Sequence, residues 1–319
     1  MRMMKLGLVA LGVLAAVASR GASAQQTVMW VSSGGAYQDA ERKAFIEPIA
    51  KKLGIQIKEA TLSSEAEVRV QVRSNTVTWD IVEFGASRCA TAAADGLLEK
   101  LDYKLINVAD YPRGTYTDHY VGSTTYAYIM AWNKKKYGDN GPKSWADFWD
   151  AQKFPGTRGL FKYPSYVLEV ALLADGVPMD KLYPIDVDRA FKSLDRIRPH
   201  VAKFWTTGAM SPQMLVDGEI SVGSAYLNRM GDLLASANPP PVAFDWNQGM
   251  VQNNYWCILK GAKNQENATK LIAFATSAEG QAGFSRETLM GPVNVNAFKL
   301  LSEDRARQLP SAPANLAKQ

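Results

Sequence analysis

The chain has 319 residues, of which 47% are hydrophobic, and a formal net charge of +5. This length allows two lobes with separate cores, which excludes a small disulfide-stapled domain. The basic residues are spread along the chain and are densest only at Lys134, Lys135 and Lys136, so the composition does not indicate a nucleic-acid-binding protein. Two histidines, His119 and His200, are too few for a histidine-rich metal site, and we expect no cofactor.

Residues 1–24 have the pattern of a secretory signal peptide. Arg2 and Lys5 give a positive start, residues 6–18 form an apolar run, and Ala-Ser-Ala at 22–24 is a small-residue cleavage site. The apolar run is too short to cross a bilayer, which takes about 20 residues. We therefore expect cleavage after Ala24 and a periplasmic protein. The alternative is an uncleaved membrane anchor.

The first part of the mature chain alternates strands and helices. The predicted strands are 27–31, 55–59 and 79–84, and the predicted helices are 37–53, 64–74 and one from about 88 to 96. Pro48 predicts a kink or an early break in the first helix. The strand 79–84 is apolar on both faces, which is typical of a parallel sheet. This alternation predicts an α/β lobe.

The second part begins with a long aromatic strand over 121–133. A short helix, capped by Ser144, then opens a second α/β region that ends near Val242. Further strands are predicted at 220–226 and 252–259, and a helix from 264 to 277. The tail from Pro310 is rich in proline and alanine, so we expect it to be frayed.

The two cysteines, Cys89 and Cys257, are far apart in the sequence. Export makes a disulfide chemically possible. The spacing does not require one, and a domain of this size does not depend on such a bond. The sequence leaves the state of the two cysteines open.

Several motifs together are specific, although each alone is weak. They are SWADFW at 144–149, FPGTRG at 154–159, LEVALL at 168–173, DGEI at 217–220 and GAKN at 261–264. This set resembles the type II periplasmic solute-binding proteins of ABC importers, in the spermidine/putrescine-binding branch. The resemblance covers residues from about 28 to 300.

The resemblance implies two α/β lobes with a ligand cleft between them. Lobe 1 would comprise residues 25–122 and 256–290, lobe 2 residues 123–255, and residues 291–319 would pack across both. The chain would be a monomer that binds a small-molecule ligand and delivers it to the membrane permease subunits of an ABC importer.

Ligands of open α/β sheets bind beyond the carboxyl ends of the strands. The loops expected there are rich in aromatic and small polar residues, which suits a small amphiphilic ligand. The predicted ligand-contacting residues are Tyr37, Ser87, Arg88, Tyr126, Tyr166, Glu169, Trp205, Tyr226, Arg229 and Asn254. Trp205 and Tyr226 fit the core of a lobe equally well, and Arg229 also fits a purely structural role.

The acidic residues of the presumed cleft indicate the class of ligand. By resemblance, Glu169 stands where the polyamine binders carry an ammonium-binding acid, whereas Tyr166 and Asn254 stand where two further acids would be. A desolvated ammonium group without a partner costs several kcal/mol. Because Arg88 and Arg229 fall in presumed cleft loops, one acid with one arginine fits a zwitterion such as an ω-amino acid better than a polyamine.

We find no catalytic motif for serine, zinc or nucleotide chemistry, and we expect a binding protein rather than an enzyme. One alternative is a secreted hydrolase that uses two carboxylates. Another is a ferric-ion binder on the same fold, for which Tyr126 and Tyr128 share one face of a predicted strand, although no partner acid is evident.

Overall fold

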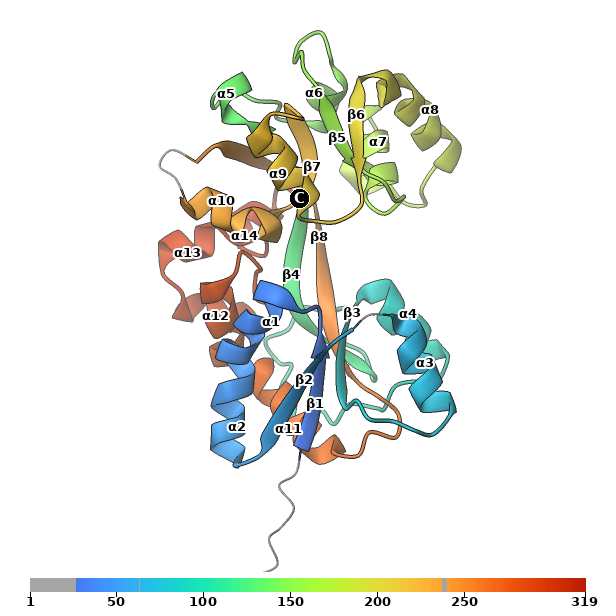
Figure 1. The fold of residues 1–319 in the computed structure, drawn as a ribbon, viewed down its shortest axis with the longest axis vertical. Coiled ribbons are helices and arrows are strands. Elements are labelled where there is room, and N and C mark those ends of the chain that lie inside the picture. The colour runs from blue at the N-terminus through green and yellow to red at the C-terminus, as the bar shows by residue number, and fades with distance from the viewer. Residues whose placement is uncertain (1–26, 63, 237–239) are drawn as a thin grey trace, which may run out of the picture.

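The computed structural model describes residues 27–62, 64–236 and 240–319, so the predicted signal peptide and its cleavage site lie outside the described residues. Figure 1 shows two α/β lobes, one above the other, joined by the long strands β4 (Tyr120–Asn133) and β8 (Val242–Ile258). We call the lobe that contains β1 the lower lobe and the other the upper lobe. No helix in the described parts of the chain is long and apolar enough to cross a membrane.

One eight-stranded sheet runs through both lobes in the order β2-β1-β3-β8-β4-β7-β5-β6. In the lower lobe, β1 (Thr27–Ser32) lies parallel to β2 (Gln56–Thr61) and to β3 (Ile81–Gly85). Strand β3 then pairs antiparallel with β8, with Ile81 opposite Ile258. The lower lobe therefore needs a strand from the far end of the chain to extend its sheet.

The predicted helix over 37–53 is divided into three parts. These are α1 (Gly35–Glu41), a π-helical segment (Arg42–Ile46) and α2 (Glu47–Leu53). Pro48 lies at the start of α2, directly after the π-helical segment, and its missing N–H removes one hydrogen bond to the preceding turn, so the irregularity falls just before it. The lower lobe also contains α3 (Glu65–Arg73), capped by the Ser64 hydroxyl, and α4 (Ala86–Ala94).

The upper lobe has the same arrangement with a different set of strands. Strand β5 (Arg158–Phe161) lies parallel to β6 (Val201–Trp205) and β7 (Val222–Tyr226), and β7 is antiparallel to β4. The Ser144 hydroxyl accepts a hydrogen bond from the Asp147 N–H at 3.1 Å, as its predicted capping role requires. The helices are α5 (Lys134–Tyr137), α6 (Trp145–Trp149), α7 (Val167–Ala174), α8 (Val187–Ile197), α9 (Met210–Asp217) and α10 (Gly231–Ser236).

Each lobe has its own buried core. Trp30 and Trp256 meet in the lower lobe with ring centroids 5.6 Å apart, and Phe45 packs against both. In the upper lobe, Trp145 and Trp205 enclose the Tyr128 ring. The two cores are connected through β4 and β8, which contribute buried residues to both.

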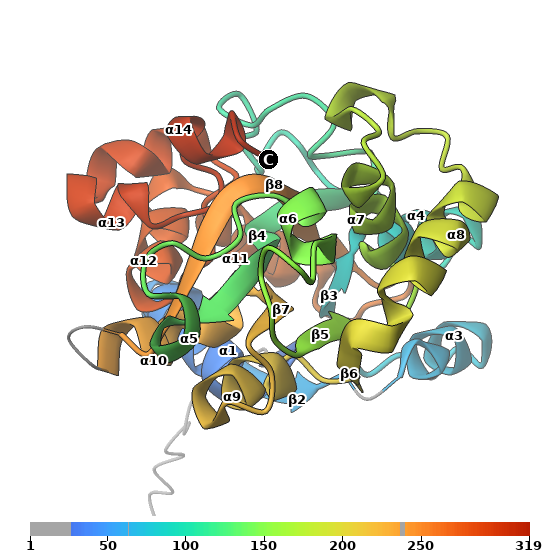
Figure 2. The same cartoon turned by 90° about the horizontal axis from the view of Figure 1, so that it is seen from above.

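The C-terminal part packs beside the two crossing strands, as Figures 1 and 2 show. It comprises α11 (Gln265–Ala275), α12 (Ala278–Glu287), a 3₁₀ segment (Val295–Leu300), α13 (Glu303–Arg307) and α14 (Pro313–Leu316). The expectation of a frayed tail is wrong. Pro313 begins a helix, the buried Asn315 amide donates to the Leu309 carbonyl at 2.8 Å, and the Gln248 N–H on β8 donates to the Lys318 carbonyl at 2.7 Å.

Candidate ligand site

The carboxyl ends of the parallel strands in both lobes face the junction between the lobes. Strand β4 begins in the lower lobe, where Tyr120 pairs with Cys257, and ends in the upper lobe, where Trp132 pairs with Val222. Because β7 is antiparallel to β4, β7 and its parallel neighbours run back toward the junction. The ends of β1 and β3 point to it from below (Figure 1). This is where an open α/β sheet binds ligands.

The predicted residues are distributed over both lobes. Tyr37 lies on α1, Ser87 and Arg88 lie in the first turn of α4, and Asn254 lies on β8 opposite Gly85 of β3. The upper lobe supplies Tyr166 and Glu169 at the start of α7, Trp205 at the end of β6, Tyr226 at the end of β7 and Arg229 in the 3₁₀ turn Leu227–Met230. Tyr126 lies on β4, opposite Gln252 of β8.

Four tyrosines from three elements meet in the upper lobe, and we call them the tyrosine platform: Tyr126, Tyr128, Tyr166 and Tyr226. The hydroxyls of Tyr126 and Tyr166 are hydrogen-bonded at 2.8 Å. The Tyr128 ring is fully buried and stacks on that of Tyr166, with centroids 4.9 Å apart, and Tyr226 meets both at its ring edge. Tyr126 and Tyr226 remain partly exposed, so the platform offers aromatic surface to a ligand.

Tyr166 has a backbone conformation that is unusual for its side chain. Its φ is +66°, in the left-handed region that large residues rarely adopt, and it is the residue just before α7. Burial of the ring and the hydrogen bond to Tyr126 hold it there. Strained residues of this kind concentrate at binding and catalytic sites.

Trp205 belongs to the core rather than to the surface of the site. Its side chain is fully buried behind the platform, with its ring 5.7 Å from that of Tyr226 and 4.5 Å from that of Phe161. Phe161, at the end of β5, was not predicted as a site residue. Its position at a strand end next to an aromatic cluster was the available signal.

The tyrosine hydroxyls stay protonated at neutral pH. Burial is the main cause that raises the pKa of Tyr126, Tyr166 and Tyr226, and the neighbouring tyrosines raise the last two further. In the described residues, no group of three or more His, Cys, Asp and Glu side chains is placed to hold a metal ion.

Charged side chains flank the platform. Glu169 accepts a hydrogen bond from the Tyr183 hydroxyl at 3.1 Å. Burial raises the pKa of Tyr166 most, and the charge of Glu169 raises it further. Arg229 is exposed and forms no salt bridge with any described carboxylate. A Cβ on Gly208 would lie 3.2 Å from the Cγ of Arg229, so the arginine stem packs against the Gly208 backbone. Arg88, in contrast, is paired with Glu65 on α3.

The lower lobe contains a buried acidic network that the sequence analysis missed. Glu83 accepts hydrogen bonds from the Tyr37 hydroxyl at 2.7 Å and the Ser123 hydroxyl at 2.5 Å. Burial raises the pKa of Glu83 to about 7. Glu41 lies deeper, fully buried beneath Trp30, and burial together with Glu83 raises its pKa. Because Glu41 has no access to solvent, the two acids do not form the open carboxylate pair that a hydrolase needs.

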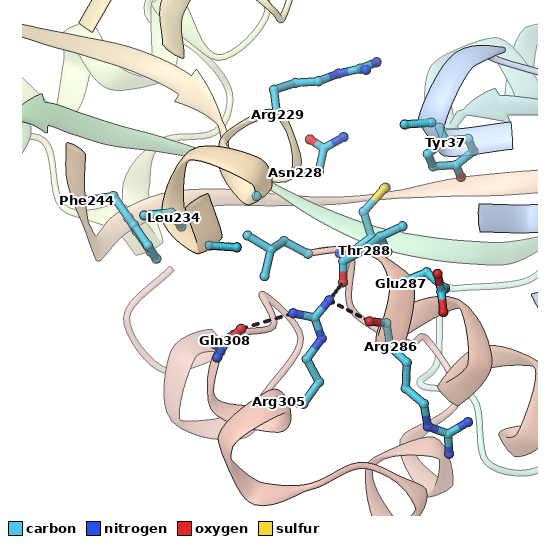
Figure 3. Close-up of a pocket in the computed structure, with 15 residues that line it drawn as sticks. Tyr37, Asn228, Arg229, Leu234, Phe244, Arg286, Glu287, Thr288, Arg305 and Gln308 are labelled. Atoms are coloured by element: carbon cyan, nitrogen blue, oxygen red, sulfur yellow. Dashed lines mark hydrogen bonds between the residues drawn. The ribbon is translucent and has the colours of Figure 1, made fainter. Parts of the chain in front are cut away.

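A cavity of about 610 Å³ lies where the two lobes meet the C-terminal segment. This size is within the usual range of ligand sites. Tyr37 and Arg229 line it from the lower and the upper lobe (Figure 3), whereas the other eight predicted residues do not. Arg305 on its far wall donates to the Ser285 carbonyl at 2.7 Å and to Gln308 at 3.1 Å, so its role is structural.

Comparisons with known proteins agree with this architecture. The family model for bacterial extracellular solute-binding proteins matches residues 44–310. The chain is 35% identical to the gamma-aminobutyric acid-binding protein of Pseudomonas aeruginosa, an alignment that covers 94% of this chain and 86% of the relative. It is 25% identical to the spermidine/putrescine-binding periplasmic protein of Escherichia coli, with 82% and 77% covered.

Among solved structures, an ABC transporter substrate-binding protein from Bradyrhizobium japonicum superposes with a TM-score of 0.88 at 42% identity, with 92% of each chain covered. These findings confirm the two-lobe fold and the family that the motifs predicted. The matched proteins are binding proteins, which supports the expectation that the chain is not an enzyme. The chain belongs to the family of bacterial extracellular solute-binding proteins.

Proposed function

We propose that this protein binds a small zwitterion with a separated amine and carboxylate, an ω-amino acid such as γ-aminobutyrate, and delivers it unchanged to an ABC permease. The observation that carries the proposal is the tyrosine platform flanked by one acid, Glu169, and one unpaired cation, Arg229. The greater identity to a γ-aminobutyrate-binding protein than to a polyamine-binding protein supports the same choice.

The charges favour a zwitterion over a polyamine. The partly exposed rings of Tyr126 and Tyr226 would pack along the methylene chain and contribute cation–π attraction to the ammonium group, about 0.5–2 kcal/mol. Glu169 would pair with the ammonium group and Arg229 with the carboxylate. A diamine would place its second ammonium group toward Arg229, where like charges repel.

Lobe closure would complete the site. We take residues 25–122 with 256–290 as one moving body and residues 123–255 as the other, with β4 and β8 as the hinge. A ligand held on the platform would contact Tyr37 and Ser87 of the lower lobe only when the lobes approach, so binding favours the closed form. The closed form of the monomer would dock on the permease after export directed by residues 1–24.

The test is a comparison of ligands that differ by one charged group. The mature protein would be titrated calorimetrically with γ-aminobutyrate, butyrate, n-butylamine and putrescine. Each lost charge-assisted contact is worth about 1.5–3 kcal/mol. We therefore expect γ-aminobutyrate to bind about tenfold to a hundredfold more tightly than either single-charge analogue. Mass spectrometry of the released ligand should show it unaltered.

Matched variants identify the contacts. Arg229→Ala should weaken γ-aminobutyrate and leave n-butylamine unaffected, and Glu169→Gln should weaken both amines. Arg113→Ala is the control, because this exposed arginine is not among the predicted ligand-contacting residues and its replacement should leave every affinity within about twofold. Putrescine binding more tightly than γ-aminobutyrate would reject the zwitterion in favour of a polyamine, and turnover of any ligand would reject a binding protein.

A further inference from the structure

The only two cysteines of the chain meet inside the lower lobe. Cys89 lies on α4 and Cys257 lies on β8, 168 positions apart in the sequence, yet their Sγ atoms are 3.1 Å apart. Both side chains are fully buried. Two sulfur atoms in van der Waals contact are separated by more than this distance. The fold therefore brings the two thiols close enough to form a bond.

The surroundings exclude the other common uses of paired cysteines. The pocket is formed by apolar side chains that include Val82, Phe84 and Leu97. Burial raises the pKa of the Cys257 thiol, and a thiolate is the form that binds metals or attacks a substrate. Within the described chain no further His, Cys, Asp or Glu joins the pair as a metal ligand.

We propose that Cys89 and Cys257 form a disulfide bond in the exported protein. One S–S bond forms and two S–H bonds break, with two protons and two electrons leaving. They pass to the disulfide of a thiol oxidoreductase of the extracytoplasmic compartment, which is reduced to a dithiol by two successive exchanges. Because neither sulfur is accessible in the folded lobe, the exchange takes place during folding, before α4 covers the site.

The bond would fasten α4 to the crossing strand. The first turn of α4 carries Ser87 and Arg88 at the lobe junction, and β8 continues into the upper lobe. A covalent link that closes so long a loop limits the unfolded chain strongly, and in the chain-entropy account its stabilising effect grows with loop length. The proposal concerns the maturation of the lower lobe and does not depend on which ligand the protein binds.

The direct test counts thiols. The full chain would be exported, trapped with acid, unfolded without reductant and treated with iodoacetamide. We expect no carbamidomethyl group on either cysteine, and two after reduction, with the unreduced chain lighter by about 2 Da for the two hydrogen atoms lost. Two carbamidomethyl groups on the unreduced chain would overturn the proposal. This readout does not require a folded variant.

A second measurement follows stability. Because the buried bond is closed to dithiothreitol in the folded lobe, the wild type would be unfolded, reduced and refolded in dithiothreitol. It should then melt several degrees below the oxidised protein, since the closed loop is long. The double variant Cys89→Ala, Cys257→Ala should melt near the reduced wild type and should not respond to reductant. A reduced and refolded wild type that melts at the same temperature as the oxidised protein would contradict the bond.

Discussion

Arg158 shows how a buried charge can serve the fold rather than the ligand. Its side chain is fully buried, and its guanidinium donates to the carbonyls of Phe148, Gly156 and Phe154. The Phe148 carbonyl belongs to α6 and the other two to the turn between α6 and β5, and both segments carry motifs that led to the family. The arginine therefore fixes the entry into β5, at whose other end Phe161 and the tyrosine platform lie.

Replacing this arginine should destabilise the upper lobe. Arg158→Met keeps the apolar stem and leaves the buried carbonyls without donors, at a cost of about 3 kcal/mol in the free energy of unfolding. Urea denaturation measures the effect. Arg113→Met, at an exposed position, is the control and should change the free energy by less than about 0.5 kcal/mol. Equal effects of the two substitutions would contradict this role.

Glu83 should make the stability of the protein depend on pH. Its pKa is raised from 4.5 to about 7 by burial, so the folded state holds a proton that the unfolded state releases between these values. The free energy of unfolding should therefore fall as the pH rises from about 4.5 to about 7, by roughly 3 kcal/mol from this residue. Glu41, with its pKa raised in the same direction, adds to the effect.

The Glu83→Gln variant isolates this contribution. As the pH rises through the same range, the free energy of unfolding of the wild type should fall relative to that of the variant. Asp180→Asn, at an exposed acid, is the control and should leave a pH-independent difference. A wild-type stability that rises with pH relative to Glu83→Gln would contradict the buried, protonated acid.

Single residues were the hardest level to predict from the sequence. The tyrosines at strand ends were predicted as site residues because their types and positions suit a ligand, and the structure brings Tyr126, Tyr166 and Tyr226 together. Whether they touch a ligand remains a prediction. The same holds for Arg88, whose salt bridge to Glu65 on another helix no local sequence pattern shows. Glu83 was overlooked inside an apolar strand, although a lone acid there is itself a signal.

At the level of elements, one glycine controls how the C-terminal segment docks. Gly291 bridges Thr125 of β4, and a Cβ on it would lie 2.9 Å from the Ser311 backbone nitrogen and 2.1 Å from its hydroxyl oxygen. That hydroxyl donates to the Pro292 carbonyl at 2.7 Å. The tail can approach β4 only because residue 291 has no side chain.

Gly291→Ala should therefore displace the tail without unfolding the lobes. We expect a loss of about 1–3 kcal/mol in the free energy of unfolding and faster proteolysis after residue 310. Gly283→Ala, inside α12, is the control. Its Cβ would lie at an ordinary contact distance of 3.5 Å from Ala44, so the substitution should be neutral or slightly stabilising. A tail as resistant in Gly291→Ala as in the wild type would contradict the contact.

Element boundaries followed the sequence where the pattern was apolar and failed where it was polar. The aromatic strand predicted over 121–133 is β4, nearly to the residue. The strand predicted at 252–259 is the second half of β8. Its first half pairs with the upper-lobe part of β4 and carries polar residues such as Asp245 and Asn247, which obscured the strand pattern. The tail was misjudged because composition does not show that Asn315 is held by two carbonyls.

For the whole molecule, ligand binding should both stabilise the protein and make it more compact. At a ligand concentration 100 times the dissociation constant, a single site adds about 2.7 kcal/mol to the free energy of unfolding. Closure around β4 and β8 should also lower the radius of gyration measured by solution scattering. For Arg229→Ala, with an affinity about tenfold to a hundredfold weaker, the same γ-aminobutyrate concentration should add only about 0.4–1.4 kcal/mol. A stabilised wild type with unaltered scattering would contradict closure.

The two-lobe arrangement came from the motifs, not from the secondary-structure pattern. Alternating strands and helices predict α/β structure in each part of the chain, but they do not show which strands pair. The pairing of β3 with β8 joins residues near 81 to residues near 258, and only the resemblance to known binding proteins indicated it before the structure. Long-range pairing of this kind depends on the packing of the complete chain.

The pairing of the strands also determines which parts of the chain can fold first during synthesis. Apart from Leu289, the buried cluster of the upper lobe comes from residues between 127 and 242, whereas the N-terminal strands share their core with Trp256, Leu271 and Phe284. The middle part of the nascent chain can thus fold early. The N-terminal third cannot complete its core until the last segments have been synthesised. Synthesis halted before residue 258 would leave β3 with an open edge, so the sheet of the lower lobe would still be incomplete.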